Sequence, residues 1–387
     1  MAKRILIVSS GTTKHIQRFL HNLSAVSGET ISFDLYAYAK FDDEDISDLE
    51  AKKVYTTKAG SFIRKLIRLP KIGVVFSIMA QCHTLSLILK KNHYNLVNIH
   101  QLPFYSYCFV RIAHQNSIQV MLTPWGSDVL RISKIYIPSL RRAFDIAQFV
   151  SGDLTVGFTQ KVKKIYSIQK EKFVNLGYGS DVISSILALN GKFTREQLIN
   201  KLGIPKAEYY ITIGYNANRS QRHSTILREI VKNKDILPSN YILIIPLSYG
   251  ADKDILIKKL GKICKEENLN AVLLKDYLTT EQVACLRLIT DVFIHIQATD
   301  AYNTSLQESL LAGAQCINGK WLEYPTLETH GIPYHVCENL ETLSMLIGEI
   351  VQNKVTPKTL HPEIKALIIE QAWDKKIKKW VEFYHNV

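Results

Sequence analysis

Strand-like and helix-like patterns alternate along the whole chain, and the alternation starts a second time near its middle. In the first half, apolar runs such as RILIVSS (4–10) and YNLVNIH (94–100) alternate with amphipathic stretches of helical periodicity. A polar helical stretch ends in Gly-Ile-Pro at 203–205, and the strand pattern YYITIGY (209–215) follows it. Strands that alternate with helices form parallel sheets covered on both faces. The sequence therefore predicts an α/β protein with two doubly wound, Rossmann-like domains that face each other across a cleft.

The length agrees with two hydrophobic cores. The chain has 387 residues, which suits two domains of roughly 150–200 residues better than one core. We expect an N-terminal domain over 1–190 and a C-terminal domain over 191–365. The last residues, 366–387, belong to a long amphipathic helix that carries Trp373 and Trp380. We expect this helix to pack back toward the N-terminal domain, because its apolar face needs a partner.

Composition excludes several classes of protein. A hydrophobic content of 47% with 11 Pro and 18 Gly excludes disordered and fibrous chains. The amino terminus enters a strand pattern directly, without the apolar run and cleavage site of a signal peptide, so we expect a cytoplasmic protein. Apolar windows such as 72–80 are shorter than the roughly 20 residues of a membrane-spanning helix, so we expect no span. Six widely separated cysteines predict free, buried thiols, with neither disulfides nor a zinc site.

Basic charge is concentrated in one part of the chain. There are 48 basic and 35 acidic residues, a net charge of +13, yet no Asp or Glu lies between Glu50 and Asp128. Within that interval, the segment SFIRKLIRLPKIGVVF (61–76) interleaves apolar and basic residues. Its basic residues are Arg64, Lys65, Arg68 and Lys71.

Three interpretations of this segment are open. A basic amphipathic helix can lie on an anionic membrane surface, where each Lys or Arg contributes about 1 kcal/mol. It can also be an ordinary solvated helix with an apolar stripe that faces the core. A nucleic-acid site is the third option, but no recognisable nucleic-acid motif is present. We favour the first interpretation and expect a protein that is peripheral on the inner face of the cytoplasmic membrane and binds no nucleic acid.

Two loops of the second half carry features of a phosphate site. Open α/β sheets bind ligands at the carboxyl ends of their strands. The loop GYNANRSQRH (214–223) follows the first strand of the second domain and places Arg219 and Arg222 just before a helix. A helix amino terminus favours anions, and arginine offers phosphate a bidentate fork. The loop PLSYGADK (246–253) lies at the same edge. Together the loops predict a diphosphate site.

The stretch 291–319 raises a second question, because Asp300 and Glu308 flank a loop that leads into a helix. Ser305 and Glu308 have the spacing of a capping box, in which both side chains satisfy amides of the first helical turn. The loop can also hold a ligand, and the two interpretations are compatible. Asp252 and Asp254 have the D-x-D spacing of some metal sites, but acids at a helix start complement its dipole, so we expect no metal.

Four segments, in order, resemble the retaining glycosyltransferases of GT-B fold, especially family 4-type enzymes. DAYNTSLQE (300–308) with the SLLAGAQCI that follows is similar to the Glu-x7-Glu element of that family, and the loop at 214–223 is similar to its loop of Gly and Arg. The other two segments are PWGSDVL (124–130) and NLGYGSDV (175–182). The sequences GYNANRSQRH and IPLSYGADK also look similar to lipid-linked 4-acetamido-4,6-dideoxygalactose transferases.

This resemblance implies transfer of a hexosyl or N-acetylaminosugar group. The donor would be a nucleoside-diphosphate sugar, and the acceptor a saccharide or a polyprenyl-diphosphate-linked glycan of cell-surface polysaccharide or glycolipid synthesis. Retention of configuration would be expected, with no metal or other cofactor. Glu308 would accept the ribose hydroxyls, Asp300 would lie beside the donor sugar, and Arg219 with Arg222 would stabilise the diphosphate charge as the sugar leaves.

The resemblance also implies further site residues. On the donor side these are Gly214, Asn216, Ser248, Tyr249, Gly250, Lys253, Asp276, Tyr277, Tyr302, Asn303, Thr304 and Ser305. On the acceptor side they are Gly11, Thr12, Thr13 and Trp125, with Asp128 and His100 as further catalytic candidates.

The sequence departs from the family at several positions. Asp300 replaces the first Glu of the motif, Arg222 stands where Lys is usual, and Trp125 stands where several members have a His. His100 follows a buried strand and can equally be a core histidine, and Trp125 can be a core residue. Two other functions stay open: a nucleotide-sugar epimerase of the same fold, and a non-catalytic subunit that binds nucleotide sugars or acts as a scaffold.

Overall fold

The computed structural model divides the chain into two compact units. Unit 1 comprises Met1–Gly179 and Trp373–Val387, and unit 2 comprises Ser180–Ala372. The structure describes residues 3–11, 13–28, 30–41, 44, 46, 49–154, 157–300 and 304–387. Three predicted site residues, Thr12, Tyr302 and Asn303, lie outside the described residues.

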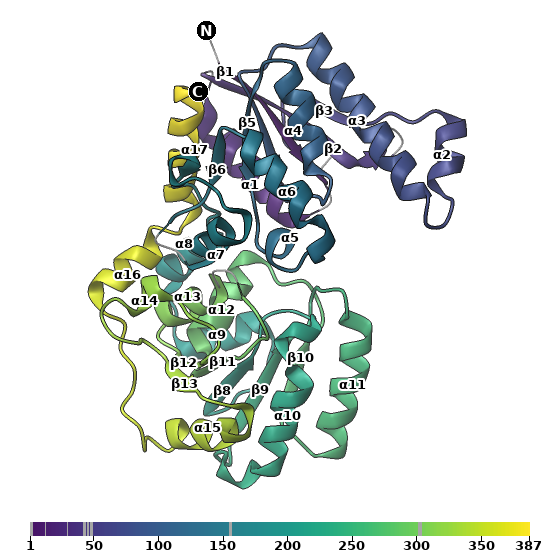
Figure 1. The fold of residues 1–387 in the computed structure, drawn as a ribbon. Coiled ribbons are helices and arrows are strands. Elements are labelled where there is room, and N and C mark those ends of the chain that lie inside the picture. The colour runs from purple at the N-terminus through teal and green to yellow at the C-terminus, as the bar shows by residue number, and fades with distance from the viewer. Residues whose placement is uncertain are drawn as a thin grey trace. The chain divides into compact units, whose positions relative to one another are not determined.

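Unit 1 is built on a seven-stranded parallel sheet in the order β3-β2-β1-β4-β5-β6-β7 (Figure 1). The strands are β1 (Lys3–Ser9), β2 (Ile31–Phe41), β3 (Val54–Thr57), β4 (Leu96–His100), β5 (Gln119–Thr123), β6 (Phe149–Ser151) and β7 (Phe173–Val174). The helices are α1 (Lys14–Ser27), α2 (Ser61–Ile67), α3 (Gly73–Lys91), α4 (Ser106–Gln115), α5 (Ser127–Leu130), α6 (Ile137–Ile146), α7 (Gly157–Tyr166) and α17 (Trp373–Asn386).

Successive side chains of β1 enter two separate cores, one on each face of the sheet. Ile5 and Ile7 pack in a cluster with residues of α1, β2 and α17, whereas Leu6 and Val8 pack with residues of α3, α4 and α6. A strand buried on both faces is apolar throughout, and this explains the continuous ILIV run of β1.

Unit 2 holds a six-stranded parallel sheet in the order β10-β9-β8-β11-β12-β13. Its strands are β8 (Tyr209–Ile213), β9 (Tyr241–Pro246), β10 (Ala271–Leu274), β11 (Val292–His295), β12 (Gln315–Gly319) and β13 (His335–Cys337). Its helices are α8 (Asp181–Leu189), α9 (Arg195–Leu202), α10 (His223–Lys232), α11 (Lys253–Glu266), α12 (Thr280–Ile289), α13 (Thr304–Leu311), α14 (Pro325–Glu328), α15 (Leu343–Val351) and α16 (Pro362–Ile369). Two parallel-sheet α/β units confirm the predicted fold class.

The boundary between the units lies earlier than residue 190, where we placed it. α8 belongs to unit 2, because its buried residues Val182, Ile183 and Ile186 join the core cluster that also contains Ala284 and Cys285 of α12. The polar stretch near 190 that suggested a linker is a loop between α8 and α9 within unit 2.

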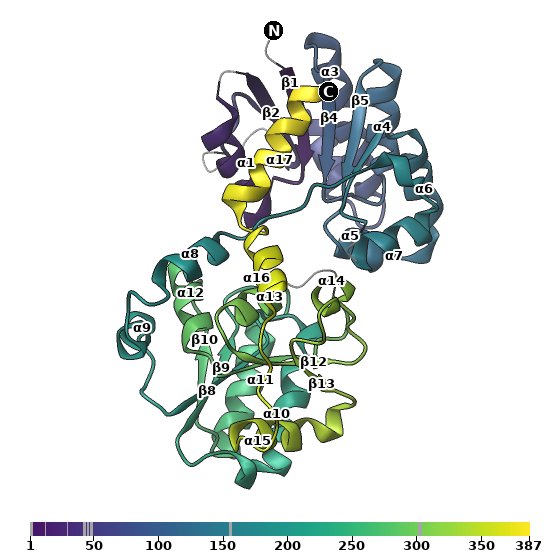
Figure 2. The same ribbon diagram turned by 90° about the vertical axis from the view of Figure 1, so that its left-hand side faces the viewer.

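The long C-terminal helix that we expected over 361–387 is two helices. α16 contributes Ile364 and Ile368 to the core of unit 2. α17 lies along α1 in unit 1, where Trp380 and Tyr384 are fully buried (Figure 2). Between the helices the backbone carbonyl of Gln371 accepts a hydrogen bond from the amide of Ser180. The helix is interrupted because its two halves bury their apolar faces in different cores.

α3 is the one helix among the described residues that is long and apolar enough to cross a membrane, by length and composition only. We expected no such helix, because apolar windows such as 72–80 are too short. The helix is longer than that window, since α3 continues to Lys91. A core helix passes the same test, and 39% of its apolar window is buried in unit 1, with Leu85 and Ile88 in the core. The six cysteines are free.

Candidate functional site

The most suitable ligand position in unit 2 lies beyond the carboxyl ends of β8 and β11. The strand order reverses between these two neighbours, since the chain runs from β8 outward to β9 and β10 and then returns to β11. Doubly wound sheets bind ligands at such a switch point. The loop after β8 contains the predicted residues Gly214, Asn216, Arg219 and Arg222, and the loop after β11 contains Asp300. The structure therefore brings these predicted residues to one edge of one sheet.

Backbone contacts join the loop after β8 to the loop after β9. The amide of Ala217 donates to the carbonyl of Tyr249 at 2.6 Å, and the amide of Asp252 donates to the carbonyl of Ala217 at 3.2 Å. Gly250 is needed for this approach, because it has φ +136° and a Cβ atom there would lie 2.6 Å from the Ala217 carbonyl. Ser248 is half-buried, and Lys253 is the first residue of α11. The four predicted residues Ser248, Tyr249, Gly250 and Lys253 therefore lie beside the loop that carries the two arginines.

The two arginines stand at the start of α10. The Nε atom of Arg219 lies 2.9 Å from Oδ1 of Asp252, and the Arg219 amide donates to Oδ2. The guanidinium of Arg222 lies 4.7 Å above the ring of Trp321, which follows β12. Arg222 is also the N-cap residue of α10, with φ 59°, so its charge adds to the positive end of the helix dipole. Two guanidinium groups and a helix amino terminus form a site suited to a diphosphate.

A buried hydrogen-bonded network lies beside the arginines. Gln221 Nε2 donates to Oε1 of Gln297 at 2.7 Å, and the amide of Gln297 lies 3.0 Å from Nε2 of His295. His295 Nδ1 is 2.9 Å from Oδ1 of Asn318 on β12. Burial lowers the pKa of His295, so the ring is neutral and donates through Nδ1 to Asn318 while Nε2 accepts from Gln297. The network fixes the loops after β8 and β11 relative to β12.

Asp300 belongs to the same loop after β11 as Gln297. The hydroxyl of Tyr324 donates to its Oδ2 atom at 2.7 Å. Burial raises the pKa of Tyr324, and the neighbouring Asp300 charge raises it further, so the phenol keeps its proton and remains a donor. Asp300 is thus a half-buried carboxylate held by one phenol at the predicted donor edge. Sequence reasoning missed Tyr324, because it lies 24 residues further along the chain.

Glu308 faces into unit 2 and is not part of a capping box. α13 begins at Thr304, so Ser305 lies inside the helix, and its carbonyl accepts from Ser309 Oγ at 2.8 Å. The Oε1 atom of Glu308 accepts from Ser180 Oγ at 2.7 Å, and Oε2 accepts from Nε of Arg287 at 3.2 Å. The predicted capping box is therefore wrong, because a buried guanidinium attracts the carboxylate more strongly than the amides of the first helical turn.

The pair of Arg287 and Glu308 is almost completely removed from water, with side-chain exposures of 4% and 7%. Sequence reasoning missed Arg287, although a signal was available. It lies within the run VACLRLI of α12, where neighbouring residues are buried, and a charged residue in such a helix requires an internal partner. Glu308 reaches the donor loops less directly than predicted, since both of its oxygens already accept a hydrogen bond.

Two further predicted donor-side residues occupy the loop after β10. Asp276 and Tyr277 are exposed there, and the ring of Tyr277 lies 6.3 Å from that of Tyr249. Asn216 is buried, and its Oδ1 atom accepts from the amide of Asn218 at 3.1 Å. Asn216 thus shapes the loop that carries the arginines.

In unit 1 two predicted acceptor residues, Gly11 and Thr13, follow β1, which neighbours β4 at the switch point of the sheet. Gly11 has φ +73°, and a Cβ atom there would lie 2.5 Å from the Cβ of Ala37. Thr13 is the N-cap residue of α1 and accepts from the amide of Ile16. The local backbone therefore accounts for both residue types.

His100 and Asp128 are held by protein contacts. His100 is fully buried, its Nδ1 atom lies 2.6 Å from the hydroxyl of Tyr178, and burial lowers its pKa to about 3. The carboxylate of Asp128 accepts hydrogen bonds from the amides of Leu102, Trp125 and Gly126. These contacts hold both side chains within unit 1, and their predicted catalytic roles stay predictions.

Trp125 packs among aromatic rings in unit 1, with centroids 5.0 Å from Tyr178 and 5.7 Å from His15. It is half-buried. The packing agrees with a core role for this residue at the rim of the switch point.

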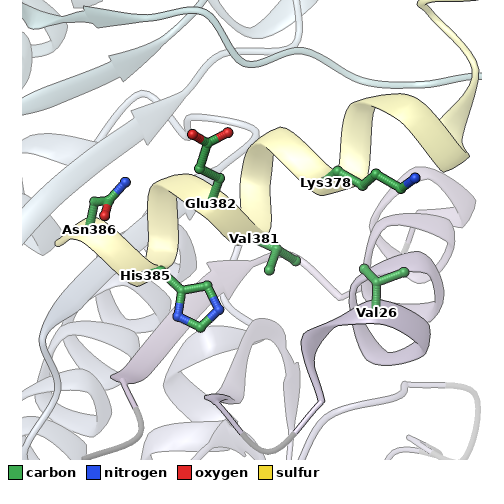
Figure 3. Close-up of a pocket in the computed structure, with 6 residues that line it drawn as sticks. All are labelled: Val26, Lys378, Val381, Glu382, His385 and Asn386. Atoms are coloured by element: carbon green, nitrogen blue, oxygen red, sulfur yellow. The ribbon is translucent and has the colours of Figure 1, made fainter.

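A surface pocket between α1 and α17 is unrelated to these residues (Figure 3). Val26, Val381 and His385 contribute to its lining. It lies at the carboxyl ends of both helices, beside the start of β1, where Lys3 bonds the carbonyl of Val387. This is the opposite edge of the sheet from the switch point, so the pocket does not mark the candidate site.

Comparisons with known proteins agree at the level of fold. No family model matches the sequence, and no curated protein matches it. The structure is similar to a glycosyltransferase from Rickettsia africae (TM-score 0.73, 12% identity, 100% of this chain and 98% of that chain). It is also similar to Anabaena HepE in complex with UDP and glucose (0.69, 13%, 100% of both chains) and to the lipopolysaccharide outer core galactosyltransferase WaaB (0.66, 12%, 98% and 99%). The two parallel α/β units and these full-length similarities show that this chain has the GT-B fold.

Proposed function

We propose that the protein is a glycosyltransferase that uses a nucleoside-diphosphate sugar as its donor. The observation that carries this proposal is the cluster at the switch point of unit 2, where Arg219 and Arg222 precede α10 and Asp300 follows β11. The structure of HepE with UDP and glucose and another with UDP-glucose support a donor of this class for the fold. The family 4 resemblance of the sequence supports retention of the anomeric configuration.

The arginines supply the charge that sugar transfer needs. As the bond between the sugar and the diphosphate breaks, negative charge grows on the leaving phosphate. The Arg219 ion pair with Asp252 uses Nε, and an arginine carries four further N–H donors on its Nη atoms. The positive end of α10 and Arg222 act on the same phosphates. This arrangement supports metal-independent catalysis, in which guanidinium groups take the part that a divalent cation plays elsewhere.

Asp300 takes the position beside the donor sugar. Its Oδ2 atom accepts the Tyr324 hydroxyl, which orients the carboxylate and leaves Oδ1 to accept a sugar hydroxyl. Glu308 orients the start of α13 from inside unit 2 through its bonds to Arg287 and Ser180. Contact of Glu308 with the ribose remains part of the proposal, because each carboxylate oxygen can accept a second hydrogen bond.

The acceptor is proposed to be a saccharide or a polyprenyl-diphosphate-linked glycan in cell-surface polysaccharide or glycolipid synthesis. Support comes from the sequence similarity to lipid-linked 4-acetamido-4,6-dideoxygalactose transferases and from the basic segment 61–76. We place the protein in the cytoplasm, peripheral on the inner face of the membrane, where such acceptors are exposed.

The test is release of nucleoside diphosphate from UDP-, GDP- and TDP-sugars, with and without a membrane lipid extract. We expect release with at least one donor, and a loss of at least about 100-fold in Arg219→Ala, since one charge-stabilising donor contributes this much. Arg228→Ala is the matched control, because Arg228 is exposed on the same helix, α10, and it should retain full activity.

The alternatives give different results in the same assay. A nucleotide-sugar epimerase converts its substrate to an isomer without transfer to the lipid extract, which chromatography of the sugar detects. A scaffold subunit binds a nucleotide sugar and releases nothing. Either result would exclude the transferase.

A further inference from the structure

Helix α2 and the first turns of α3 extend away from the sheet of unit 1. Figure 1 shows α2 at the edge of the unit, beyond α3. None of the residues of α2 (Ser61–Ile67), all of which are described, is buried. A helix of a soluble unit normally buries one apolar stripe. Residues 61–79, which comprise α2, the turn after it and the first turns of α3, are called the tip.

The tip presents large apolar side chains to solvent. Their exposed fractions lie between 41% and 69%, and they make up six of the 16 large hydrophobic residues that are exposed in the described part of the chain. These residues are Phe62, Leu69, Ile72, Val74, Val75 and Met79. Single exposed apolar residues are ordinary, but six within 18 positions mark a contact surface.

Basic residues of the tip flank the apolar ones. Lys65, Arg68 and Lys71 are exposed. Arg64 is half-buried, and its Nε atom donates to the carbonyl of Ala59 at 2.9 Å, so it braces the tip more than it faces outward. No acidic residue lies between Glu50 and Asp128 to offset these charges.

The turn between the helices is tightly built. The amide of Gly73 donates to the carbonyl of Leu69 at 3.0 Å, and a Cβ atom on Gly73 would lie 2.0 Å from the carbonyl oxygen of Ile67. Lys71 has φ 64°. Only glycine allows the start of α3 to approach the end of α2 this closely. The apolar residues are thus held in place before any partner binds, which lowers the entropic cost of binding.

We propose that the tip docks on an anionic phospholipid surface, with its apolar side chains inserted at the boundary of headgroups and acyl chains. The side chains of Lys65, Arg68 and Lys71 then meet the headgroup phosphates. Charge complementarity favours this partner, because the tip carries basic residues and no acidic ones. Amphipathic surface helices combine apolar and basic residues in this way. The inference rests on the peripheral membrane location proposed for the enzyme and deepens it by naming the surface that makes the contact. Docking itself requires neither donor nor acceptor.

The charge component is tested by co-sedimentation of the full chain with vesicles. Wild type should bind vesicles of phosphatidylcholine and phosphatidylglycerol far better than phosphatidylcholine alone, and salt should weaken binding. The triple variant K65Q/R68Q/K71Q should partition about 100-fold more weakly, at about fivefold per charge. The control K258Q/K259Q/K265Q removes three exposed lysines of α11 and should bind as wild type does.

The insertion component is tested by a second variant, F62S/I72S/V75S. It should lose binding to the anionic vesicles at high salt, where charge attraction is screened. Its control, I135S/I332S/M345S, replaces three exposed apolar residues outside the tip and should still bind the anionic vesicles at high salt. In addition, Phe62→Trp should give fluorescence that brominated phospholipids quench beyond the quenching of wild type, which reports depth.

Three results would overturn the proposal. The first is equal binding to both kinds of vesicle by wild type and both tip variants. The second is a change of sedimentation coefficient in the tip variants without lipid, which would assign the tip to contact with a second copy. The third is binding of a DNA duplex by wild type that both tip variants abolish, with no binding of vesicles. Donor turnover in the absence of lipid, measured in the same variants, separates these outcomes from a failure of the proposed reaction.

Discussion

Replacing Arg287 with methionine should strongly destabilise unit 2. Methionine has nearly the length of arginine and can pack against Phe293, over which the guanidinium lies at 5.3 Å. The change therefore removes the charge with little loss of volume. Glu308 then keeps a carboxylate with only 7% side-chain exposure, and among the described residues the hydroxyl of Ser180 is its remaining hydrogen-bond partner.

The expected loss of stability follows from the burial of the ion pair between Arg287 and Glu308. Removing one member of a buried ion pair costs about 3–5 kcal/mol, because the other charge stays in a low-dielectric interior. For a unit of this size each kcal/mol lowers the melting temperature by about 2–4 °C. The Tm of unit 2 should therefore fall by roughly 6–20 °C. The double variant R287M/E308Q should lose less stability than R287M, since it leaves no buried charge unpaired.

Differential scanning calorimetry of the full chain is the appropriate assay, because two units need not unfold in one step. Arg228→Met, on the exposed side of α10, is the control and should change stability by less than about 0.5 kcal/mol. The reasoning would be refuted by an R287M protein as stable as the control, or by a double variant less stable than R287M. Either result would mean that removing Arg287 does not leave Glu308 as an unpaired buried charge.

Three further predictions follow from individual residues. Burial lowers the pKa of His100 from 6.5 to about 3. Between these two pH values the unfolded chain binds a proton at this residue that the folded chain does not. The contribution of His100 to the free energy of unfolding is therefore fully present above pH 6.5 and falls by about 1.4 kcal/mol per pH unit toward pH 3. Urea unfolding of unit 1 between pH 7 and pH 4 should show this slope, and His100→Gln should reduce it; an unchanged slope would contradict the burial argument. Gly250→Ala should weaken donor binding in calorimetric titration, because its Cβ would meet the Ala217 carbonyl, whereas Gly261→Ala, with open space inside α11, should stabilise by about 1 kcal/mol and leave binding intact. Tyr324→Phe should lower kcat for sugar transfer more than it raises KM, because it frees Asp300; equal kinetics would remove Tyr324 from the site.

Local patterns in the sequence predicted the parts of the site that lie close to strand ends. The run YYITIGY predicted β8, and a loop after such a strand must lie at the carboxyl edge of its sheet, so Arg219 and Arg222 could be placed there without the structure. Asp300 could be placed in the same way after β11. The pairings of these residues could not be predicted. The sequence placed the loop of Asp252 at the same edge, but only the structure shows that Asp252 pairs with Arg219 and that Trp321 lies against Arg222.

The orientation of Glu308 shows where a local rule fails. The spacing from Ser305 to Glu308 fits a capping box, and nothing within one helical turn argues against it. Arg287 lies 21 residues earlier and competes for the carboxylate only once α12 and α13 are packed together. In a buried setting the ion pair is stronger than a bond to an amide that water could also satisfy.

What the sequence alone determined is the type of fold and most of its elements, because hydrophobic periodicity depends on near neighbours. It did not show that the C-terminal stretch forms two helices. Tertiary structure decided which core each element joins. α8 and α16 belong to unit 2, while α17 returns to unit 1, and the apolar faces of these helices are too alike in sequence to reveal their partners. It also decided that the apolar residues of the tip stay exposed, since the pattern at 61–79 is the same whether a helix lies against a core or outside it.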